Sequence, residues 1–438
     1  MYDLIIKNGK LVTPDRIFEA TVAINDGKYA AIVAPGTELE AKEVIDARGN
    51  YVYPGIIDCH AHLNEPGFEY REDFETGSRA AAVAGCTTLI DMPLNNDPSL
   101  MNKEIFDLKM GKISKHSVVD YALWGGIVGD YNNEPGSVKN NMNDLVDLHN
   151  CGVAAFKGFT CPNGDLFPTV NMGNVRKALE ILKPYNALCG FHCEEFGQVL
   201  EREKEAKAKE GRTNEEKIRD FLDAHDVWTE LVATKNVLDM CRATGGRVHI
   251  CHVSHPAVAE VVKQAIYEGL PVTAETCPHY LGYTEDFVFE KGAPAKCTPP
   301  MRTKADMEKM WDYVLDGTLS CIGSDHSPAA DEEKDNDKDN EKPDEKPDDS
   351  LKGDIDVTSA ESVAELVNSL LKESIFDKLD SVNDLVSGAG ESIKISDIVG
   401  LTSSINVLAD NFTVNGEKTD LLFRSVTFAE SMGNAYQG

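Results

Sequence analysis

The sequence has no run of about 18 uncharged apolar residues, so no transmembrane helix is expected. Positive charge is also scarce: 43 Lys and Arg residues stand against 74 Asp and Glu residues, a formal net charge of −31. Such a surface repels DNA, RNA and anionic membranes, which are therefore excluded as expected partners. The N-terminus carries Asp3 and only a short apolar run, unlike a secretory signal peptide. These absences favour a cytoplasmic protein.

Paired Cys-x-x-Cys elements of the zinc-ribbon kind are missing as well, although the chain has eleven cysteines. Their number is odd, they are scattered, and several lie inside apolar runs. This distribution indicates reduced thiols and argues against a disulfide framework. Hydrophobic residues make up 42% and charged residues 27% of the chain, the balance of a globular protein with a sizeable core.

Composition divides the 438 residues into four segments. Residues 1–53 predict a small β-sandwich-like domain, with strands over 3–6, 11–12, 21–24 and 30–33 separated by turn signals. Residues 54–330 contain eight short apolar runs that alternate with helical stretches, expected over 74–84, 174–182, 213–240 and 257–268. This alternation is typical of parallel βα units, and eight of them predict a (β/α)8 TIM-like barrel. An open doubly wound sheet has the same periodicity and stays an alternative.

The last quarter of the chain has a different composition. Residues 331–353 predict an acidic flexible linker, because positions 331–350 hold 11 acids, 4 lysines and no aliphatic or aromatic residue. Residues 354–438 form an atypical C-terminal region, with amphipathic helices expected over 361–371 and 374–385 and weak strand character over 411–423. This quarter shows no pattern that indicates chemistry.

The most informative local pattern is Asp58-Cys59-His60-Ala61-His62, which directly follows an apolar run. Alternate residues of a strand point to the same face, so His60 and His62 are expected side by side. Two imidazoles at the C-terminal end of a barrel strand suit a transition metal. A short His-x-His pattern is more often a pair of surface histidines, but its place at a strand end favours the metal.

Four more polar side chains follow later apolar runs, where barrel enzymes place catalytic groups. They are Lys157, His192, His252 and Asp325. Each alone has an ordinary structural interpretation, such as a helix N-cap for Asp325. Burial disfavours a charged lysine, so the amine of Lys157 can instead be neutral and capture carbon dioxide as a carbamate, an anionic metal ligand. Together, six metal-competent side chains at five strand ends predict a metal site.

Longer motifs carry a family resemblance over about residues 1–328. They are PGIIDCHAHLNEPG (54–67), FKGF (156–159), FHCE (191–194), ICHVS (250–254), ETCPHY (275–280) and GSDHSP (323–328). With these motifs the chain resembles the cyclic amidohydrolases of the amidohydrolase superfamily. DMPLN (91–95) and HLNEP (62–66) are typical of the allantoinase branch of that family.

The resemblance implies a binuclear metal site, usually of zinc. One ion would be bound by His60, His62 and Asp325, and the other by His192 and His252. A carbamate formed on Lys157 from carbon dioxide would bridge the two ions. Asp325 would also act first as general base and then as general acid during hydrolysis.

His249 competes with His252 for this assignment. The two are an odd number of residues apart, so they face opposite sides of a regular strand. The motif favours His252 as the ligand, and His249 is then expected to pack outward.

The expected substrate contacts are Asn64, Asn95 and Cys297. Dihydroorotase-like relatives carry a carboxylate-binding arginine at position 64, so Asn64 disfavours a carboxylated ring. The two asparagines offer donors and acceptors to ureido and imide groups, and Cys297 lies in a segment resembling a loop that contacts the ring through its backbone. Conversion of allantoin to allantoate in purine degradation is therefore the expected reaction.

Two other functions stay open. A dihydropyrimidinase or hydantoinase performs the same chemistry on another ring, and a scaffold protein keeps the fold without catalysis. The resemblance further implies a homotetramer. Beyond Pro328 the family's motifs are missing, so we expect the metal site to form while the tail does not dock as it does in relatives.

Overall fold

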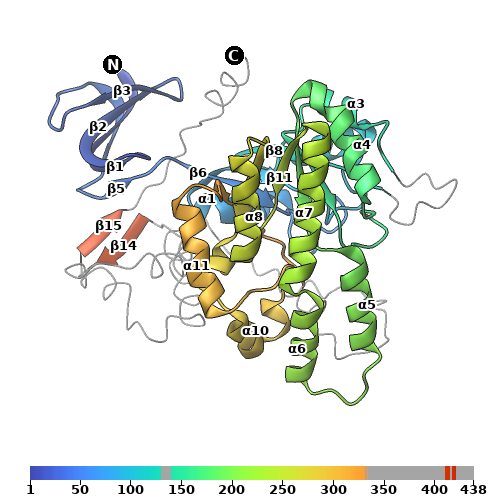
Figure 1. Cartoon of the computed structure of the whole chain (residues 1–438). Coiled ribbons are helices and arrows are strands. Elements are labelled where there is room, and N and C mark those ends of the chain that lie inside the picture. The colour runs from blue at the N-terminus through green and yellow to red at the C-terminus, as the bar shows by residue number, and fades with distance from the viewer. Residues whose placement is uncertain (130–139, 331–332, 334–409, 415–416, 421–438) are drawn as a thin grey trace.

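The computed structural model describes residues 1–129, 140–330, 333, 410–414 and 417–420. It has two main parts, an N-terminal sheet and a barrel of parallel strands surrounded by helices (Figure 1). The expected acidic linker, Glu333 apart, and the helices expected over 361–371 and 374–385 lie outside the described residues. In the region of expected strand character, β14 (Asp410–Val414) pairs antiparallel with β15 (Glu417–Asp420).

The N-terminal sheet has five strands in the order β3-β2-β1-β4, with β5 also paired to β1. Their bounds are β1 (Tyr2–Val12), β2 (Ile17–Asn25), β3 (Lys28–Val33), β4 (Ala41–Asp46) and β5 (Tyr51–Val52). Two strands were expected where the structure has the single strand β1. The pairing of β1 with β2 shifts register between Ile6 and Gly9, so a bulge interrupts the apolar pattern without ending the strand.

Eight parallel strands form the barrel in chain order. They are β6 (Ile56–Ala61), β7 (Cys86–Asp91), β8 (Asp120–Gly126), β9 (Ala155–Phe159), β10 (Leu188–His192), β11 (Arg247–Ile250), β12 (Val272–Thr276) and β13 (Cys321–Ile322). A doubly wound sheet reverses its strand order at a switch point, and this sheet does not. The predicted barrel is confirmed.

The barrel closes where β6 meets β13, a join that we call the seam. A bridge links Ala61 to His326, the Asp325 amide donates to the His60 carbonyl (2.8 Å), and the His62 amide donates to the His326 carbonyl (2.7 Å). The seam is thus made by the segments that carry the first and last candidate metal ligands, which closure brings together.

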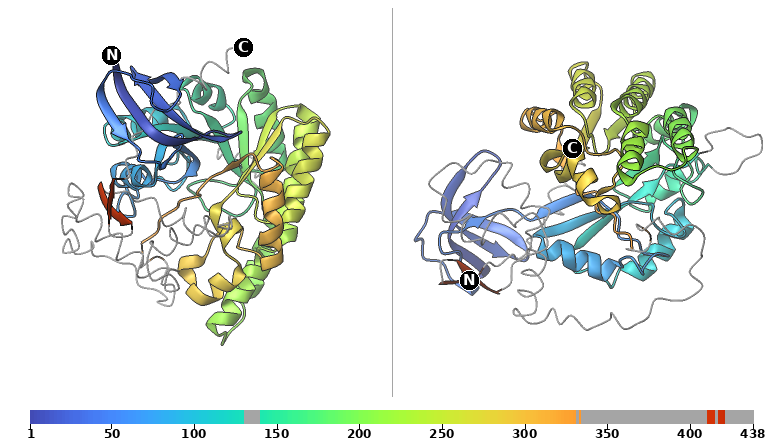
Figure 2. Two further views of the ribbon diagram at one scale, coloured as in Figure 1. Left: turned by 90° about the vertical axis from the view of Figure 1, so that its left-hand side faces the viewer. Right: turned by 90° about the horizontal axis from the view of Figure 1, so that it is seen from below.

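Helices cover the outside of the barrel, and Figure 2 shows them around the strands with the N-terminal sheet at one side. Their bounds are α1 (Phe74–Val83), α2 (Lys103–Ile113), α3 (Leu145–Asn150), α4 (Met172–Leu182), α5 (Phe196–Lys207), α6 (Asn214–Ala224), α7 (Val227–Thr244), α8 (Pro256–Tyr267), α9 (Pro278–Gly282), α10 (Glu285–Lys291) and α11 (Lys304–Leu315), with short 3-10 turns at Lys183–Tyr185 and Ala293–Ala295. Within the described parts of the chain, no helix combines the length and apolarity that a membrane crossing needs.

The helix expected over 213–240 is wrong, because the structure has two helices there. His225 leaves the helical conformation (φ −111°, ψ 40°), and the Asp226 side chain then caps α7 by accepting hydrogen bonds from the amides of Trp228 and Thr229. Asp226 therefore starts α7 directly after His225 has ended α6, although the amphipathic pattern of the sequence continues across the break. The helices expected over 74–84 and 257–268 are confirmed to within one residue by α1 and α8.

Candidate metal centre

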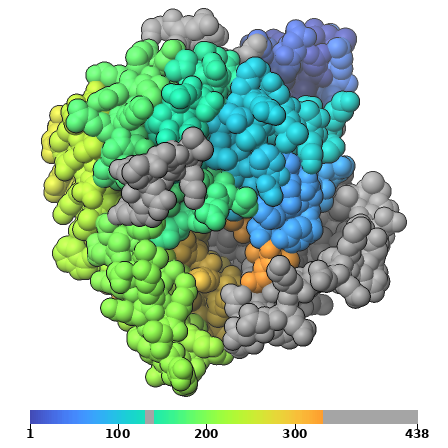
Figure 3. Space-filling model, turned by 90° about the vertical axis from the view of Figure 1, so that its right-hand side faces the viewer, coloured from blue at the N-terminus to red at the C-terminus, as the bar shows by residue number. Residues whose placement is uncertain are grey.

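The six candidate ligands lie at the C-terminal half of the barrel. His60 lies in β6 and His62 directly after it, Lys157 is in β9, His192 ends β10, His252 follows β11 by two residues, and Asp325 follows β13 by three. Parallel strands present their C-terminal ends at one rim, so strands far apart in sequence deliver side chains to one place. Figure 3 shows a hollow on one face of the molecule, with the orange segment of the last barrel unit visible in it.

Interatomic distances show that the candidate ligands converge. Oδ1 of Asp325 lies 3.1 Å from Nε2 of His60 and 3.2 Å from Nε2 of His62. The ring centre of His252 is 5.4 Å from that of His60 and 4.5 Å from that of His192. One donor atom each from His60, His252 and Asp325 lies within 4.8 Å of the other two. The spacing is that of side chains around a common centre.

Three buried nitrogen atoms in this cluster have no hydrogen-bond partner among the described residues. They are Nδ1 of His62, Nδ1 of His252 and Nζ of Lys157. Leaving a buried polar atom unpaired costs about 1–3 kcal/mol, so three at one place need an explanation. A donor set of imidazoles, a carboxylate and a carbamylatable amine suits divalent transition-metal ions. The residues present therefore fit a metal centre.

Lys157 corrects one expectation. It lies in the middle of β9 rather than at its end, with its side chain fully buried in the barrel. Burial lowers the pKa of its amine, but attraction by Cys251, Glu275 and Asp325 outweighs burial and raises the pKa above its usual value. Burial alone therefore does not decide the charge of this amine, because the negative groups around it were not visible in the sequence.

Asp325 is held as a carboxylate. Burial raises its pKa, but the charges of His60 and His252 and the hydrogen bonds from His60 and His62 lower it well below the usual range. An ionised carboxylate among imidazoles is the form that can bind a cation or accept a proton.

Four of the predicted site residues have left-handed backbone conformations that non-glycine residues rarely adopt. They are Asn64 (φ 51°), Asn95 (φ 59°), His252 (φ 36°) and Asp325 (φ 51°). Each such residue costs of order 1–3 kcal/mol and persists only where its surroundings fix it. All four lie in loops that follow barrel strands, where this conformation re-aims side chains after the strands have ended.

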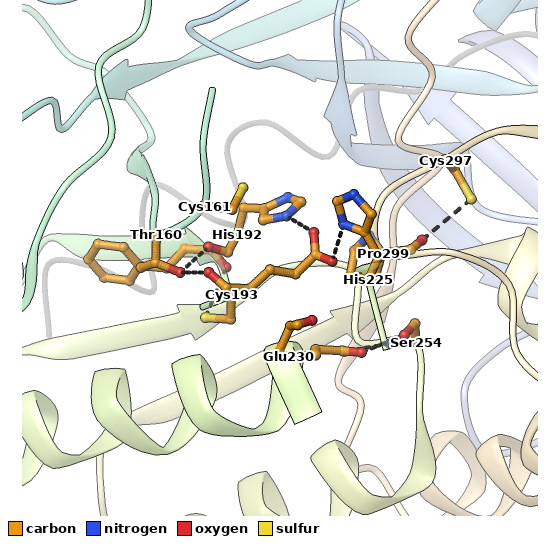
Figure 4. A network of polar contacts seen from close by, with 12 residues as sticks. Thr160, Cys161, His192, Cys193, His225, Glu230, Ser254, Cys297 and Pro299 are labelled. Atoms are coloured by element: carbon orange, nitrogen blue, oxygen red, sulfur yellow. Dashed lines mark hydrogen bonds and ion pairs between the residues drawn. The ribbon is translucent and has the colours of Figure 1, made fainter. Parts of the chain in front are cut away.

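Two buried carboxylates that the sequence interpretation missed orient the candidate ligands. Oε1 of Glu275 contacts Nδ1 of His60 and accepts from the His252 amide (3.2 Å). Oε2 of Glu194 lies 2.6 Å from Nε2 of His192, and its Oε1 lies 2.8 Å from Nδ1 of His225. Figure 4 shows His192 and His225 within this network of polar contacts. A carboxylate on the second ring nitrogen fixes the tautomer of a metal-binding histidine.

The pKa of Glu194 reflects this pairing. Burial raises the pKa, but the hydrogen bonds with His192 and His225 lower it to about 2. Glu194 belongs to the FHCE motif and Glu275 to the ETCPHY motif, both quoted above. The sequence signal that could have identified them is an acidic residue at the end of a buried strand.

His249 faces the barrel interior, so the expected outward packing is wrong. Its Nδ1 lies 2.8 Å from Oγ1 of Thr273 and its Nε2 lies 3.4 Å from Oε2 of Glu275. The strand ends at Ile250, and the left-handed conformation at His252 breaks the alternation on which the expectation depended. Both histidines therefore point inward at different depths.

The three expected substrate contacts lie near the cluster. Asn64 is fully buried, and its Oδ1 has no hydrogen-bond partner among the described residues. Nδ2 of Asn95 donates to Oγ of Ser327 (2.8 Å), two residues beyond Asp325. The thiol of Cys297 lies 3.4 Å from the Pro299 carbonyl, and burial and the charge of Asp325 raise its pKa to about 12. A neutral thiol is consistent with packing rather than nucleophilic attack.

Gly323 leaves room that the site needs. A methyl group added there meets Cβ of His60 at 2.8 Å and Oε2 of Glu275 at 3.2 Å. Gly323→Ala is expected to lower the free energy of unfolding by about 1–3 kcal/mol through overpacking. Gly111→Ala is the matched control, because nothing lies within 4 Å of its added methyl and it is inside α2, where alanine stabilises by about 0.5–1 kcal/mol. Urea denaturation measures both, and equal stability of the two variants would contradict the prediction.

Comparisons with known proteins agree with this geometry. The model of the amidohydrolase family matches residues 51–333. The chain is 38% identical to the allantoinase of Salmonella paratyphi B over 339 residues, covering 76% of this chain and 71% of that protein. The L-hydantoinase (dihydropyrimidinase) of Arthrobacter aurescens has a similar structure, with a TM-score of 0.70, 31% identity and coverage of 76% of this chain and 71% of that one. The dihydropyrimidinase of Brevibacillus agri has a TM-score of 0.65 at 27% identity, covering 75% and 69%.

Proposed function

Because this chain belongs to the amidohydrolase family, whose members are metal-dependent, we propose that its substrate is allantoin and its product allantoate. The chain is a hydrolase that acts on the C–N bond of a cyclic amide. The observation that carries the proposal is the cluster of six candidate ligands with three unpaired buried nitrogens. The similar solved structures are those of an L-hydantoinase and a dihydropyrimidinase. A hydantoin or dihydropyrimidine ring is therefore the second candidate substrate.

The metal centre that we propose contains two zinc ions. His60, His62 and Asp325 would hold one ion and His192 and His252 the other, with a carbamate on Lys157 between them. Ions bound there would polarise the scissile carbonyl and lower the pKa of a water molecule toward neutrality. The convergence of these side chains at one rim supports this assignment.

Asp325 is the residue that we propose carries the proton. Its Oδ1 is close to His60 and His62, and its ionised state makes it able to accept the proton of the attacking water. The same carboxyl group then gives that proton to the ring nitrogen as the C–N bond breaks. Water adds to the carbonyl carbon and the nitrogen leaves protonated, so no covalent intermediate with the chain is needed.

Asn64, Asn95 and Cys297 are proposed to bind the ring and its ureido group. The unpaired Oδ1 of Asn64 offers an acceptor to a substrate N–H. An asparagine at this position cannot pair with a carboxylate as an arginine does, which favours a neutral ring.

A panel of four ring substrates tests the substrate assignment. We expect allantoin to give the highest kcat/KM among allantoin, hydantoin, dihydrouracil and dihydroorotate. Turnover of dihydrouracil alone would overturn allantoin in favour of a dihydropyrimidinase. A protein that binds fewer than about one metal ion per chain and hydrolyses none of the four would support the scaffold alternative.

Glu194→Gln is expected to weaken metal binding about 10–100-fold, the usual effect of removing a carboxylate partner from a metal-binding histidine. The amide keeps the shape of Glu194 but loses the charge that pairs with His192 and His225. Titration of metal-free protein against a competing chelator measures the affinity. Glu195→Gln is the control, because that neighbouring carboxylate caps α5 by accepting from the Gln198 amide. Equal affinities for the two variants would contradict the role of Glu194.

We also propose a homotetramer in the cytoplasm, on the strength of the family resemblance. Size-exclusion chromatography with light scattering tests the subunit number, and a mass of one or two chains would contradict it.

A further inference from the structure

A second group of metal-competent side chains lies at the seam, beside the candidate metal centre. We call it the thiol cluster, and its members are Cys59, Cys321, Glu275 and His249. The sulfur of Cys59 is 3.8 Å from the sulfur of Cys321 and 3.4 Å from Oε2 of Glu275. Nε2 of His249 is also 3.4 Å from this oxygen. The donor atoms of Cys59, Glu275 and Cys321 all lie within 4.8 Å of one another.

We propose that the thiol cluster is a third metal site, for a thiophilic divalent cation such as Zn²⁺ or Cd²⁺. Two thiolates and a carboxylate are donors that such ions prefer, and the imidazole of His249, close to Glu275, is the candidate for the fourth position of a tetrahedral shell. None of these side chains is among the six candidate ligands described above. Cys59 and Cys321 are each only partly buried as residues. Each thiol releases its proton to water as the sulfur–metal bond forms.

Glu275 connects the thiol cluster to the candidate metal centre. One oxygen, Oε1, contacts Nδ1 of His60, whereas Oε2 faces Cys59 and His249. A cation bound to Oε2 withdraws negative charge from the carboxylate that orients His60, so excess cation is expected to inhibit hydrolysis. This inhibition rests on the proposed function, whereas binding of the cation does not.

The location also predicts an effect on stability. Cys59 lies on β6 and Cys321 on β13, so an ion bound by both sulfurs joins the two strands across the seam. The unfolded chain does not hold these side chains together, and binding to the folded state alone raises the melting temperature.

Cadmium is the probe that tests the proposal, because cadmium–thiolate bonds absorb in the ultraviolet. The full chain, loaded with no more than two zinc ions per chain and kept reduced by a phosphine, is titrated with Cd²⁺. We expect a thiolate–cadmium band that saturates at one ion per chain, a rise in melting temperature, and a loss of hydrolysis that follows the band. The six candidate ligands of the metal centre contain no thiol, but Cys251 lies within 4.8 Å of donor atoms of His60 and Glu275, so the variants below assign the band to the thiol cluster.

Three cysteine variants provide the controls. Cys59→Ala and Cys321→Ala each remove one thiolate and are expected to lose the saturating band and the rise in melting temperature. Cys151→Ala removes another partly buried thiol, at the end of α3, and is expected to behave as the unchanged chain does. One of the variants Cys59→Ala and Cys321→Ala is enough for the test, provided that its circular dichroism spectrum is that of the folded unchanged chain.

The outcomes separate the third site from the proposed function. No band in the unchanged chain, or the same band in a folded Cys59→Ala or Cys321→Ala variant, would overturn the third site. A band that these variants abolish, in a chain that hydrolyses no cyclic amide, would support the third site and contradict the proposed function alone.

Discussion

Asp325→Asn is expected to lower kcat for allantoin about 10²–10⁴-fold, the range that general acid–base catalysis contributes. Asparagine keeps the shape of the side chain but cannot accept the proton of water and return it to the ring nitrogen. The residue is also a proposed metal ligand, so the measurement is made at saturating metal with the bound metal determined on the same sample. Under these conditions the loss reports proton transfer rather than an empty site.

The control for this variant is Asp316→Asn. Asp316 pairs with Lys263 at the surface (2.8 Å), and the hydrogen bonds with Lys263 and Thr318 lower its pKa to about 2. It resembles Asp325 in being a strongly acidic, ion-paired carboxylate but belongs to the end of α11. Its removal is expected to leave kcat within about twofold, since surface ion pairs contribute about 0–1 kcal/mol. A metal-loaded Asp325→Asn variant with unchanged kcat would contradict the proton-carrying role.

The strands of the barrel and the place of the candidate site were predictable because both depend on local pattern. Short apolar runs gave the strands, and parallel strands bring their C-terminal ends to one rim. His60 and His62 could therefore be placed together from their spacing alone, and the structure puts both within 3.2 Å of Asp325.

The errors arise where a long-range contact or a local break overrides the pattern. His249 was assigned to the wrong face because alternation was extended past Ile250, where the strand ends. The helix expected over 213–240 was too long because the amphipathic pattern hid the cap at Asp226. The charge of Lys157 could not be decided from the sequence, because the negative charges of Glu275 and Asp325 reach it only after folding.

Buried charged residues were the least predictable part of the site. Lys109 is fully buried, with its ammonium paired to Asp91 (2.5 Å) and Asn96 (2.8 Å). In the sequence it looks like a surface lysine of an amphipathic helix. Asp91 in turn accepts a hydrogen bond from the Leu63 amide, next to His62, so this pair fixes the loop that carries a candidate ligand. Such pairs form between strands and helices far apart in the chain, where no periodicity signals them.

Lys157→Ala is the second variant with a large expected effect, a fall in kcat of at least about 10²-fold together with a loss of bound metal. Removing a carboxylate that only supports a ligand costs about 10–100-fold, and this substitution removes the proposed bridging ligand itself. The amine of Lys157 is fully buried, and its described contact is with the ring of Phe159, 5.0 Å from the ring centre, without a hydrogen-bond partner among the described residues. Metal analysis and steady-state kinetics on the same preparation measure the two effects.

Short carboxylic acids distinguish a bridging carbamate from a simple packing role for Lys157. Alanine leaves a cavity where the side chain lay, and acetate or propionate placed there supplies the oxygen pair that a carbamate would supply. We expect either acid to restore part of the bound metal and of kcat in Lys157→Ala, but to do nothing for Lys183→Ala, whose amine donates to the Thr244 carbonyl far from the site. Reconstitution of the unchanged chain with zinc is likewise expected to be faster with bicarbonate than without it. Full metal content and activity in Lys157→Ala without added acid would contradict the bridge, because the remaining five side chains would then suffice to hold both ions.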